Sequence, residues 1–104
     1  MKGGYYAFYF IAMTDLQDLM PVLMRLLQQK KPCWVCFFDS LKEKRQFYNY
    51  KGEELKKFVE NVCKKNNLPI PLIDFYGHDD KQPFEDKYQQ IRPEYVFIQN
   101  VFHK

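Results

Sequence analysis

The stretch Tyr5-Tyr6-Ala7-Phe8-Tyr9-Phe10-Ile11-Ala12-Met13 decides the fold of this chain. It is apolar and aromatic at every position, whereas a strand with one face in water alternates apolar and polar residues. Its nine residues are about half of what a membrane-spanning helix needs. The stretch therefore predicts a strand that is covered on both faces, which is typical of a parallel β-sheet.

A helix is expected directly after this strand. Thr14-Asp15-Leu16-Gln17 resembles a capping box, in which the Thr14 side chain accepts a hydrogen bond from the Gln17 amide. An apolar stripe follows at helical spacing, formed by Leu16, Leu19, Met20, Leu23, Leu26 and Leu27. Because proline fits best in the first turn of a helix, Pro21 favours a start of regular helix at Asp18, with Asp18 as the cap.

Three further apolar runs alternate with two further helical patterns. The runs cover residues 33–38, 72–76 and 95–99, and the helical patterns cover residues 52–65 and a shorter segment between Pro83 and Pro93. The expected buried faces are Leu55, Phe58, Val59 and Val62 on the first of these helices and Phe84, Tyr88 and Ile91 on the second. Residues 41–50 form a long polar connection.

This alternation predicts a single α/β domain over residues 1–104. Parallel strands joined by helices take right-handed crossovers. Helices reach both faces of the sheet only if the strand order reverses once, so we expect the order 3-2-1-4. The predicted fold is a three-layer, Rossmann-like or flavodoxin-like domain with a four-stranded parallel sheet.

The predicted topology locates a candidate binding site. In open parallel sheets, ligands bind beyond the carboxyl ends of the strands, where the strand order reverses. Here that point lies between the first and fourth strands. The predicted substrate-binding residues at or beside this edge are Thr14, Asp15, Asp39, Ser40, His78, Gln99 and Asn100. No catalytic residue is assigned.

Simpler roles are favoured for several of these residues. Thr14 and Asp15 fit helix capping, although the free N–H groups of the same helix N-terminus can also hold an anion. Asp39-Ser40 fits a strand-end cap as well as a pair that binds a sugar hydroxyl. His78 and the two carboxylates after it fit a polar loop as well as a general base.

Cofactor and metal sites are not expected. Residues 12–16 contain no glycine, whereas a dinucleotide-binding turn needs glycines to let the backbone approach a pyrophosphate. Cys33 and Cys36 have the spacing of a thiol redox motif, but residues three apart on a strand point to opposite faces. Cys63, His78 and His103 lie in separate regions and give no zinc spacing. We expect buried, unreactive thiols.

The composition narrows the partners and the location. The net charge is +3, and the lysines are mixed with glutamates, which favours an ordinary charged surface over a nucleic-acid site. An anionic membrane surface is retained as an alternative partner. The three cysteines and the absence of a recognisable signal peptide predict a reducing, cytoplasmic location.

Two segments carry a resemblance to a known family. The segment Leu19-Met20-Pro21-Val22-Leu23-Met24-Arg25-Leu26-Leu27 looks like a proline-containing first helix, and Ile91-Arg92-Pro93-Glu94-Tyr95-Val96-Phe97-Ile98-Gln99-Asn100 looks like an "R-P-D-x-V" helix-to-strand junction. With the first strand and the Thr14-Asp15 loop, they resemble the N-terminal half of GT-B glycosyltransferases and of related sugar-nucleotide epimerases and glycerophosphotransferases.

The resemblance implies the acceptor side of a two-domain transferase. In that family the N-terminal half receives the acceptor, here a sugar or a polyol phosphate, and the C-terminal half binds the nucleotide sugar. The chain departs from the family in having no Gly-rich first loop and no second domain. Activity is therefore expected only with a second Rossmann-like domain or a partner chain.

A different class of function is also open. A non-enzymatic, flavodoxin-like binding or regulatory module fits the same fold, and a phosphoacceptor receiver is its best-known form. Asp15 and Asp74 match the receiver carboxylates only in part. A thiol redox protein that uses Cys33 and Cys36 is a third alternative.

Overall fold

The computed structural model describes residues 4–11, 13–38, 52–77 and 79–99. Strands and helices alternate in the order β1 (Tyr6–Phe10), α1 (Met13–Gln28), β2 (Cys33–Phe38), α2 (Gly52–Lys65), β3 (Leu72–Tyr76), α3 (Lys81–Ile91) and β4 (Tyr95–Ile98). The strands form one parallel sheet in the order β3-β2-β1-β4. This confirms the predicted α/β fold, its strand order and the interior position of the first strand.

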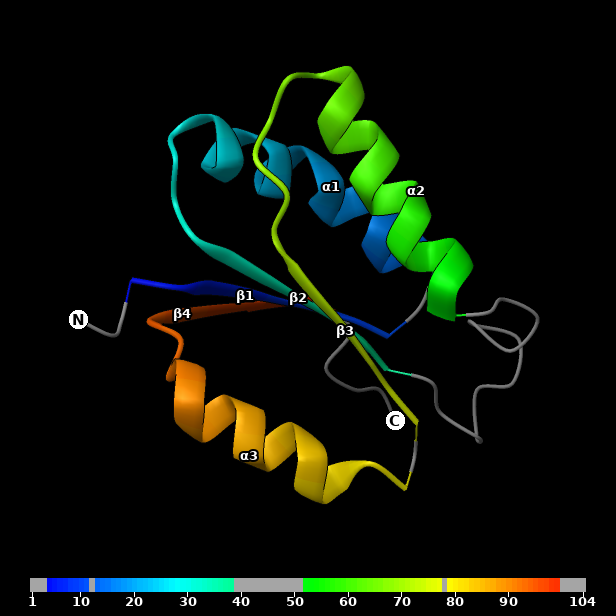
Figure 1. Cartoon of the computed structure of the whole chain (residues 1–104), viewed down its shortest axis with the longest axis vertical. Helices are drawn as coiled ribbons and strands as arrows, with labels where there is room; N and C mark the ends of the chain where they lie inside the picture. The colour runs from blue at the N-terminus through cyan, green and yellow to red at the C-terminus, as the bar shows by residue number, and fades with distance from the viewer. Residues whose placement is uncertain (1–3, 12, 39–51, 78, 100–104) are drawn as a thin grey trace.

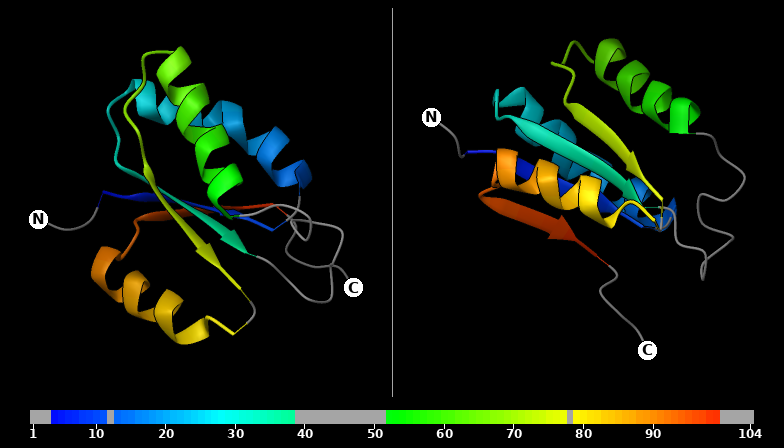
Figure 2. Two further views of the ribbon diagram at one scale, coloured as in Figure 1. Left: turned by 45° about the vertical axis from the view of Figure 1, so that its right-hand side comes forward. Right: turned by 60° about the horizontal axis from the view of Figure 1, so that its bottom comes forward.

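The sheet lies between two helical layers. Helices α1 and α2 cover one face and α3 covers the other (Figure 1). The chain steps from β1 to β2 to β3 in one direction and then returns past β2 and β1 to β4. Right-handed crossovers in opposite directions place their helices on opposite faces. The further views in Figure 2 show β4 at the edge of the sheet, beside β1.

Aromatic side chains fill both spaces between the layers. On the side of α1 and α2, Phe8 and Phe10 are fully buried, and Phe8 stacks on Phe97 with ring centroids 4.7 Å apart. On the side of α3, the buried Trp34 stacks on Phe84 at 5.8 Å. Burying such a side chain contributes about 1.5–3 kcal/mol. The aromatic side chains of β1 and β2 therefore serve largely as core packing, as expected for a sheet that is covered on both faces.

Helix α1 begins five residues earlier than predicted. It starts at Met13 and not at Asp18, so β1 ends at Phe10 and Thr14 lies within the first turn. The side chain that stabilises this start is Asp15, whose buried carboxylate accepts a hydrogen bond from the backbone N–H of Ile11 at 2.9 Å. A carboxylate in the first turn also interacts favourably with the helix dipole.

The prediction was wrong because Pro21 is tolerated inside α1. Proline has no N–H, so the carbonyl of Gln17, four residues earlier, loses its helical hydrogen bond. Both residues are exposed, and water can satisfy that carbonyl. The apolar stripe on the other side of the helix anchors it to the sheet through the buried side chains of Leu16, Met20, Leu23 and Leu27.

The buried faces of the other helices agree with the sequence except at one residue. Leu55 and Val59 of α2 are buried as expected, but Phe58 is 47% exposed. Helix α2 contacts β3 at the edge of the sheet, and an edge position covers a narrower stripe of a helix than an interior one. On α3, Ile91 is buried and Phe84 and Tyr88 pack against the same core, as predicted.

All three helices end on a residue with positive φ that is not glycine. These residues are Lys30 (φ 63°), Asn67 (φ 57°) and Arg92 (φ 48°). At α1 the Lys30 N–H donates to the carbonyl of Leu27 and the Lys31 N–H to that of Leu26, which is the Schellman pattern. α2 repeats this pattern around Asn67. Glycine is the residue that adopts this conformation without steric cost.

Replacing either Lys30 or Asn67 with glycine is expected to stabilise the protein. Each change relieves a left-handed conformation, which outweighs the extra entropy of glycine in the unfolded chain, and should add about 0.5–1 kcal/mol to the free energy of unfolding. Urea unfolding followed by circular dichroism measures it. Lys64→Gly, within the last turn of α2, is the control and should destabilise. A loss of stability in Lys30→Gly or Asn67→Gly would contradict this account of the helix ends.

Candidate functional site

The sheet has its switch point where the sequence placed it. The ends of β1 and β4 lie side by side, with Tyr9 in register with Ile98. The chain leaves β1 into α1 on one face, whereas it reaches β4 from α3 on the other face. The carboxyl ends of these two strands therefore open between connections that run in opposite directions, which is the usual position of a ligand site in parallel sheets.

Asp15, one of the predicted site residues, faces the interior of the protein. Its side chain is fully buried, and Oδ2 accepts the hydrogen bond from Ile11 N. This bond ties the end of β1 to the first turn of α1. Asp15 thus has a structural role at the start of α1, in line with the capping role considered for it. Its contact with a substrate stays a prediction.

Thr14 and Gln99 are the predicted residues whose side chains reach the surface at this edge. Thr14 lies in the first turn of α1 and is exposed. Gln99 follows β4, and its Nε2 donates a hydrogen bond to Oδ2 of Asp18 at 2.7 Å. This bond connects β4 to α1 across the switch point. Sequence patterns did not single out Asp18 as a site residue, because its partner is distant along the chain.

The remaining predicted residues, namely Asp39, Ser40, His78 and Asn100, lie outside the described residues. Gly77, which precedes His78, is described. Its N–H donates to Oδ2 of Asp80 at 2.7 Å, and the Asp80 N–H donates to the Gly77 carbonyl at 3.1 Å. These reciprocal bonds fix the turn that leads from β3 into α3.

The described part of this edge includes the N-terminus of α1. The first turn of a helix has backbone N–H groups without partners inside the helix, and the helix dipole adds positive potential there. Phosphate groups bind to such helix ends. At α1 this end lies at the switch point, next to the exposed hydroxyl of Thr14. Both carboxylates nearby, Asp15 and Asp18, accept hydrogen bonds from the protein itself.

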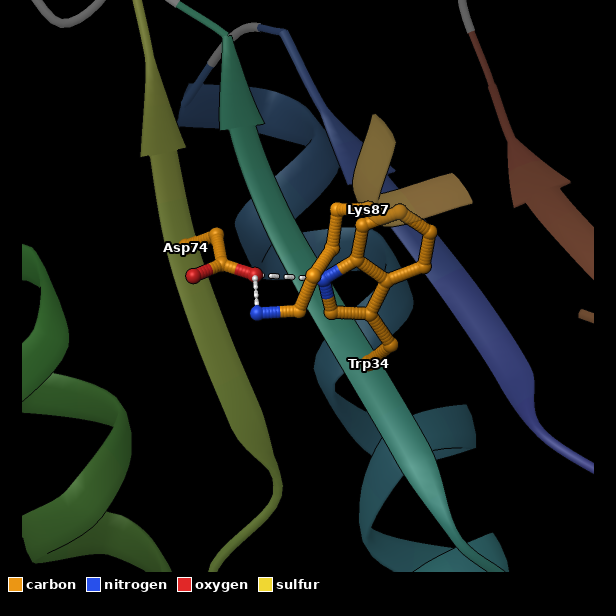
Figure 3. Close-up of polar contacts among 3 residues, drawn as sticks. All are labelled: Trp34, Asp74 and Lys87. Atoms are coloured by element: carbon orange, nitrogen blue, oxygen red, sulfur yellow. Dashed lines mark hydrogen bonds and ion pairs between the residues drawn. The ribbon is translucent and has the colours of Figure 1, made fainter. Parts of the chain in front are cut away.

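A second polar cluster lies under α3 (Figure 3). Oδ2 of Asp74, in the middle of β3, accepts a hydrogen bond from the indole N–H of Trp34 at 2.7 Å. The same oxygen forms an ion pair with Nζ of Lys87, on α3, at 3.3 Å. The two charged side chains are about one-third exposed or less, at 33% for Lys87 and 28% for Asp74. The cluster joins β2, β3 and α3.

The sequence holds a signal for this cluster. Asp74 is the one charged residue in the run Leu72-Ile73-Asp74-Phe75-Tyr76, and a carboxylate in such a run needs a partner. In the sheet, Leu72 is in register with Trp34 and Asp74 with Cys36. Trp34 therefore meets Asp74 along the diagonal between neighbouring strands, which long side chains can span.

The cluster suppresses the acidity of its neighbours. Burial, and next the negative charge of Asp74, raise the pKa of the Cys36 thiol, although Lys87 opposes them. Burial also raises the pKa of the Tyr76 phenol, with further contributions from the charge of Asp74 and a hydrogen bond to it. Neither group is ionised near neutral pH. The cluster joins α3 to the sheet through Lys87 and Asp74.

The two cysteines of the CxxC spacing lie in different cores. Cys33 is buried on the side of α1 and α2, and Cys36 on the side of α3. Burial, and to a lesser degree Cys63, raise the pKa of the Cys33 thiol from 9.0 to about 12. All three thiols are free and buried. The prediction that the sulfurs diverge is confirmed, and nothing in this geometry favours a thiol redox protein.

Other described features limit the kinds of site further. A hollow of about 400 Å³ lies at the amino ends of the strands and another of about 500 Å³ lies along α3, and neither is lined by the predicted site residues. Within the described ranges, no three metal-ligating side chains cluster. Each helix of the described chain is too short or too polar to cross a bilayer.

The fold and the switch point define an α/β protein of the Rossmann-like or flavodoxin-like class. Comparison with protein-family models gives no match, and the same is true for curated protein sequences and for solved structures.

Asp74 and Lys87 should contribute unequally to stability. Asp74→Ala leaves the buried indole N–H of Trp34 without its acceptor and should cost about 1–3 kcal/mol. Lys87→Ala removes a partly exposed ion pair and should cost at most about 1 kcal/mol. Urea unfolding compares them, with Gln90→Ala, exposed on the same helix, as the control. Equal losses of stability in the two variants would mean that the hydrogen bond from the Trp34 indole does not account for the contribution of Asp74.

The thiols should be protected in the folded protein. At pH 8, Cys33 and Cys36 should react with iodoacetamide far more slowly than in the urea-unfolded chain, as measured by mass spectrometry. Rapid labelling of the folded protein would contradict the burial of these thiols.

The raised pKa of Cys33 also makes the stability of the protein depend on pH. Above about pH 9 the unfolded chain loses this proton and the folded protein keeps it, so stability should fall up to about pH 12. A stability that stays constant from about pH 9 to about pH 12 would contradict this raised pKa.

Proposed function

We propose that this chain is the acceptor-side, N-terminal domain of a GT-B-type glycosyltransferase or glycerophosphotransferase. The observation that carries the proposal is the switch point, where the end of β1, the first turn of α1 and the end of β4 meet on a parallel sheet. The helix-to-strand junction of the family resemblance coincides with the segment between α3 and β4, which supports the same proposal.

The proposed ligand is a sugar or a polyol phosphate that serves as the acceptor. A phosphate would bind to the first-turn N–H groups of α1. The Thr14 hydroxyl and the Gln99 amide would contact the phosphate or the hydroxyl groups of the acceptor. Asp39, Ser40, His78 and Asn100 complete the proposed site as sequence-based predictions. Recognition of this kind needs no cofactor and no metal from this chain.

The proposal includes a second Rossmann-like domain or a partner chain. Asp15 and Asp18 are already hydrogen-bonded within the protein, so the described part of the edge supplies no carboxylate that is free to act as a base. Glycosyl transfer needs groups that bind the donor and stabilise its departing phosphate. In the proposed assembly these groups come from the second domain, across the cleft above β1 and β4.

The exposed surface of β4 also supports a larger assembly. Tyr95 is 56% exposed, and Val96 and Ile98 are each 39% exposed. β4 is an edge strand of the sheet, and the unpaired backbone N–H and C=O groups of an edge strand can pair with another chain. The partner domain or chain of the proposal would cover this surface.

The second candidate function is a non-enzymatic binding module of flavodoxin-like type. The engagement of Asp15 and Asp18 within the protein favours it, because binding alone needs no free catalytic group. A phosphoacceptor receiver is a poor form of this alternative. Asp74, its expected carboxylate on the third strand, lies in the middle of β3 and is held by Trp34 and Lys87 beneath α3, away from the carboxyl edge.

Binding of glycerol 3-phosphate to the chain tests the proposed site. Titration followed by amide NMR should shift the signals of Thr14, Asp15 and Gln99. Thr14→Ala should weaken binding about three- to tenfold through the loss of one hydrogen bond. Gln90→Ala, on the exposed face of α3, should leave it unchanged. Shifts confined to other parts of the chain would rule out this site.

A transfer assay separates the two candidate functions. With a nucleotide-activated sugar or glycerol as donor, the chain alone should show no turnover, and addition of a second Rossmann-like domain should produce it. Full transfer by the isolated chain would contradict the two-domain proposal. Binding of glycerol 3-phosphate without transfer in any combination would favour the non-enzymatic module.

A further inference from the structure

A groove of about 400 Å³ lies at the amino edge of the sheet, at the opposite end from the switch point. Its walls come from the connection between α1 and β2 and the connection between α2 and β3, which run side by side above the sheet in Figure 1. Leu27 lines it from the core. Ile70 and Leu72 remain 44% and 41% exposed. The groove therefore presents apolar side chains to solvent.

Positive charge lies beside this apolar surface. Lys30 and Lys31 line the groove and are exposed, and none of the described residues that line it is acidic. Helix α2 ends at the same edge with Lys64 and Lys65, because the helices of this fold run antiparallel to the strands. Exposed cations beside apolar side chains are complementary to an acidic partner that also carries an apolar group.

The conformation of Lys30 is costly for a lysine. Its φ of 63° places it at the position after α1 where glycine is strongly preferred. A cation near a helix C-terminus interacts favourably with the helix dipole. Asn67 holds the same position after α2 without a charge, so the dipole does not demand a cation there. Binding of an anionic partner gives a second reason for a lysine at position 30.

We propose that this groove binds an extended, acidic segment of a partner protein. An apolar side chain of the segment would pack against Ile70 and Leu72, and its carboxylates would pair with Lys30 and Lys31. A volume of about 400 Å³ lies within the usual range of about 300–1,000 Å³ for ligand pockets. A few residues of an extended chain fit such a space. This interaction is separate from the proposed transferase function, because it uses the other end of the sheet.

The shape of the site favours a peptide over a lipid surface. The hollow is lined in part by the buried side chains of Leu27 and Cys33, which the flat surface of a bilayer would not reach. An extended peptide can enter the groove and bury its apolar side chain there. Rim lysines then contribute mainly to the rate and the salt dependence of association.

Fluorescence anisotropy with a labelled peptide tests this proposal on the full chain. The probe carries glutamates on both sides of a central leucine. One matched peptide has lysines in place of the glutamates, and another has serine in place of the leucine. The glutamate–leucine peptide should bind, each matched peptide should bind at least about threefold more weakly, and added salt should weaken the interaction.

Three variants separate binding from stability. Lys30→Gly should raise the melting temperature but weaken peptide binding about threefold, and Lys31→Ala should weaken binding to a similar extent. Asn67→Gly is the matched control, because it relieves the same backbone conformation without removing a charge. It should raise the melting temperature and leave the affinity unchanged.

Several results would overturn the proposal. The first is equal binding of the glutamate and lysine peptides, and the second is unchanged affinity in both lysine variants. The third is binding of phosphatidylserine vesicles, lost in Lys30→Gly, by a chain that does not bind the peptide. That result would identify a membrane surface as the partner. Loss of glycerol 3-phosphate binding at the switch point would leave this proposal intact.

Discussion

The structure depends on covering β1 from both sides. Phe8 and Phe10 point toward α1 and α2, Ala7 points toward α3, and all three are fully buried. A strand of this kind must have parallel neighbours on both edges and helices on both faces. One reversal of the strand order meets these demands. That reversal places the proposed acceptor site at the carboxyl ends of the strands and leaves the lysine-lined groove at the amino ends.

Two carboxylates, the buried Asp15 and the partly buried Asp74, organise the fold. Asp15 ties the end of β1 to α1, and Asp74 joins β2, β3 and α3 through Trp34 and Lys87. A carboxylate that is placed inside a protein needs hydrogen-bond donors or a positive charge, and both residues have them. The switch-point edge presents the N-terminus of α1, and the opposite edge presents Lys30 and Lys31.

Periodicity and turn residues predicted most of the elements correctly. The bounds of β2, α2 and β3 agree with the sequence patterns, since proline, glycine and asparagine mark their ends. The start of α1 and the exposure of Phe58 were predicted wrongly. Propensity places Pro21 in a first turn, but packing of the apolar stripe of α1 outweighs one missing hydrogen bond. The exposure of a helical residue depends on how far its helix lies from the centre of the sheet, which periodicity does not encode.

The sequence by itself determined the parallel sheet, the strand order and the edge at which the strand order reverses. These follow from local patterns and from the handedness of crossovers, which hold for any chain with this order of elements. Only the tertiary structure decided the pairing of Asp74 with Trp34 and Lys87, the link from Gln99 to Asp18, and the meeting of two distant connections in the lysine-lined groove. Such contacts join residues far apart along the chain, so they are set by register and by the distance between layers.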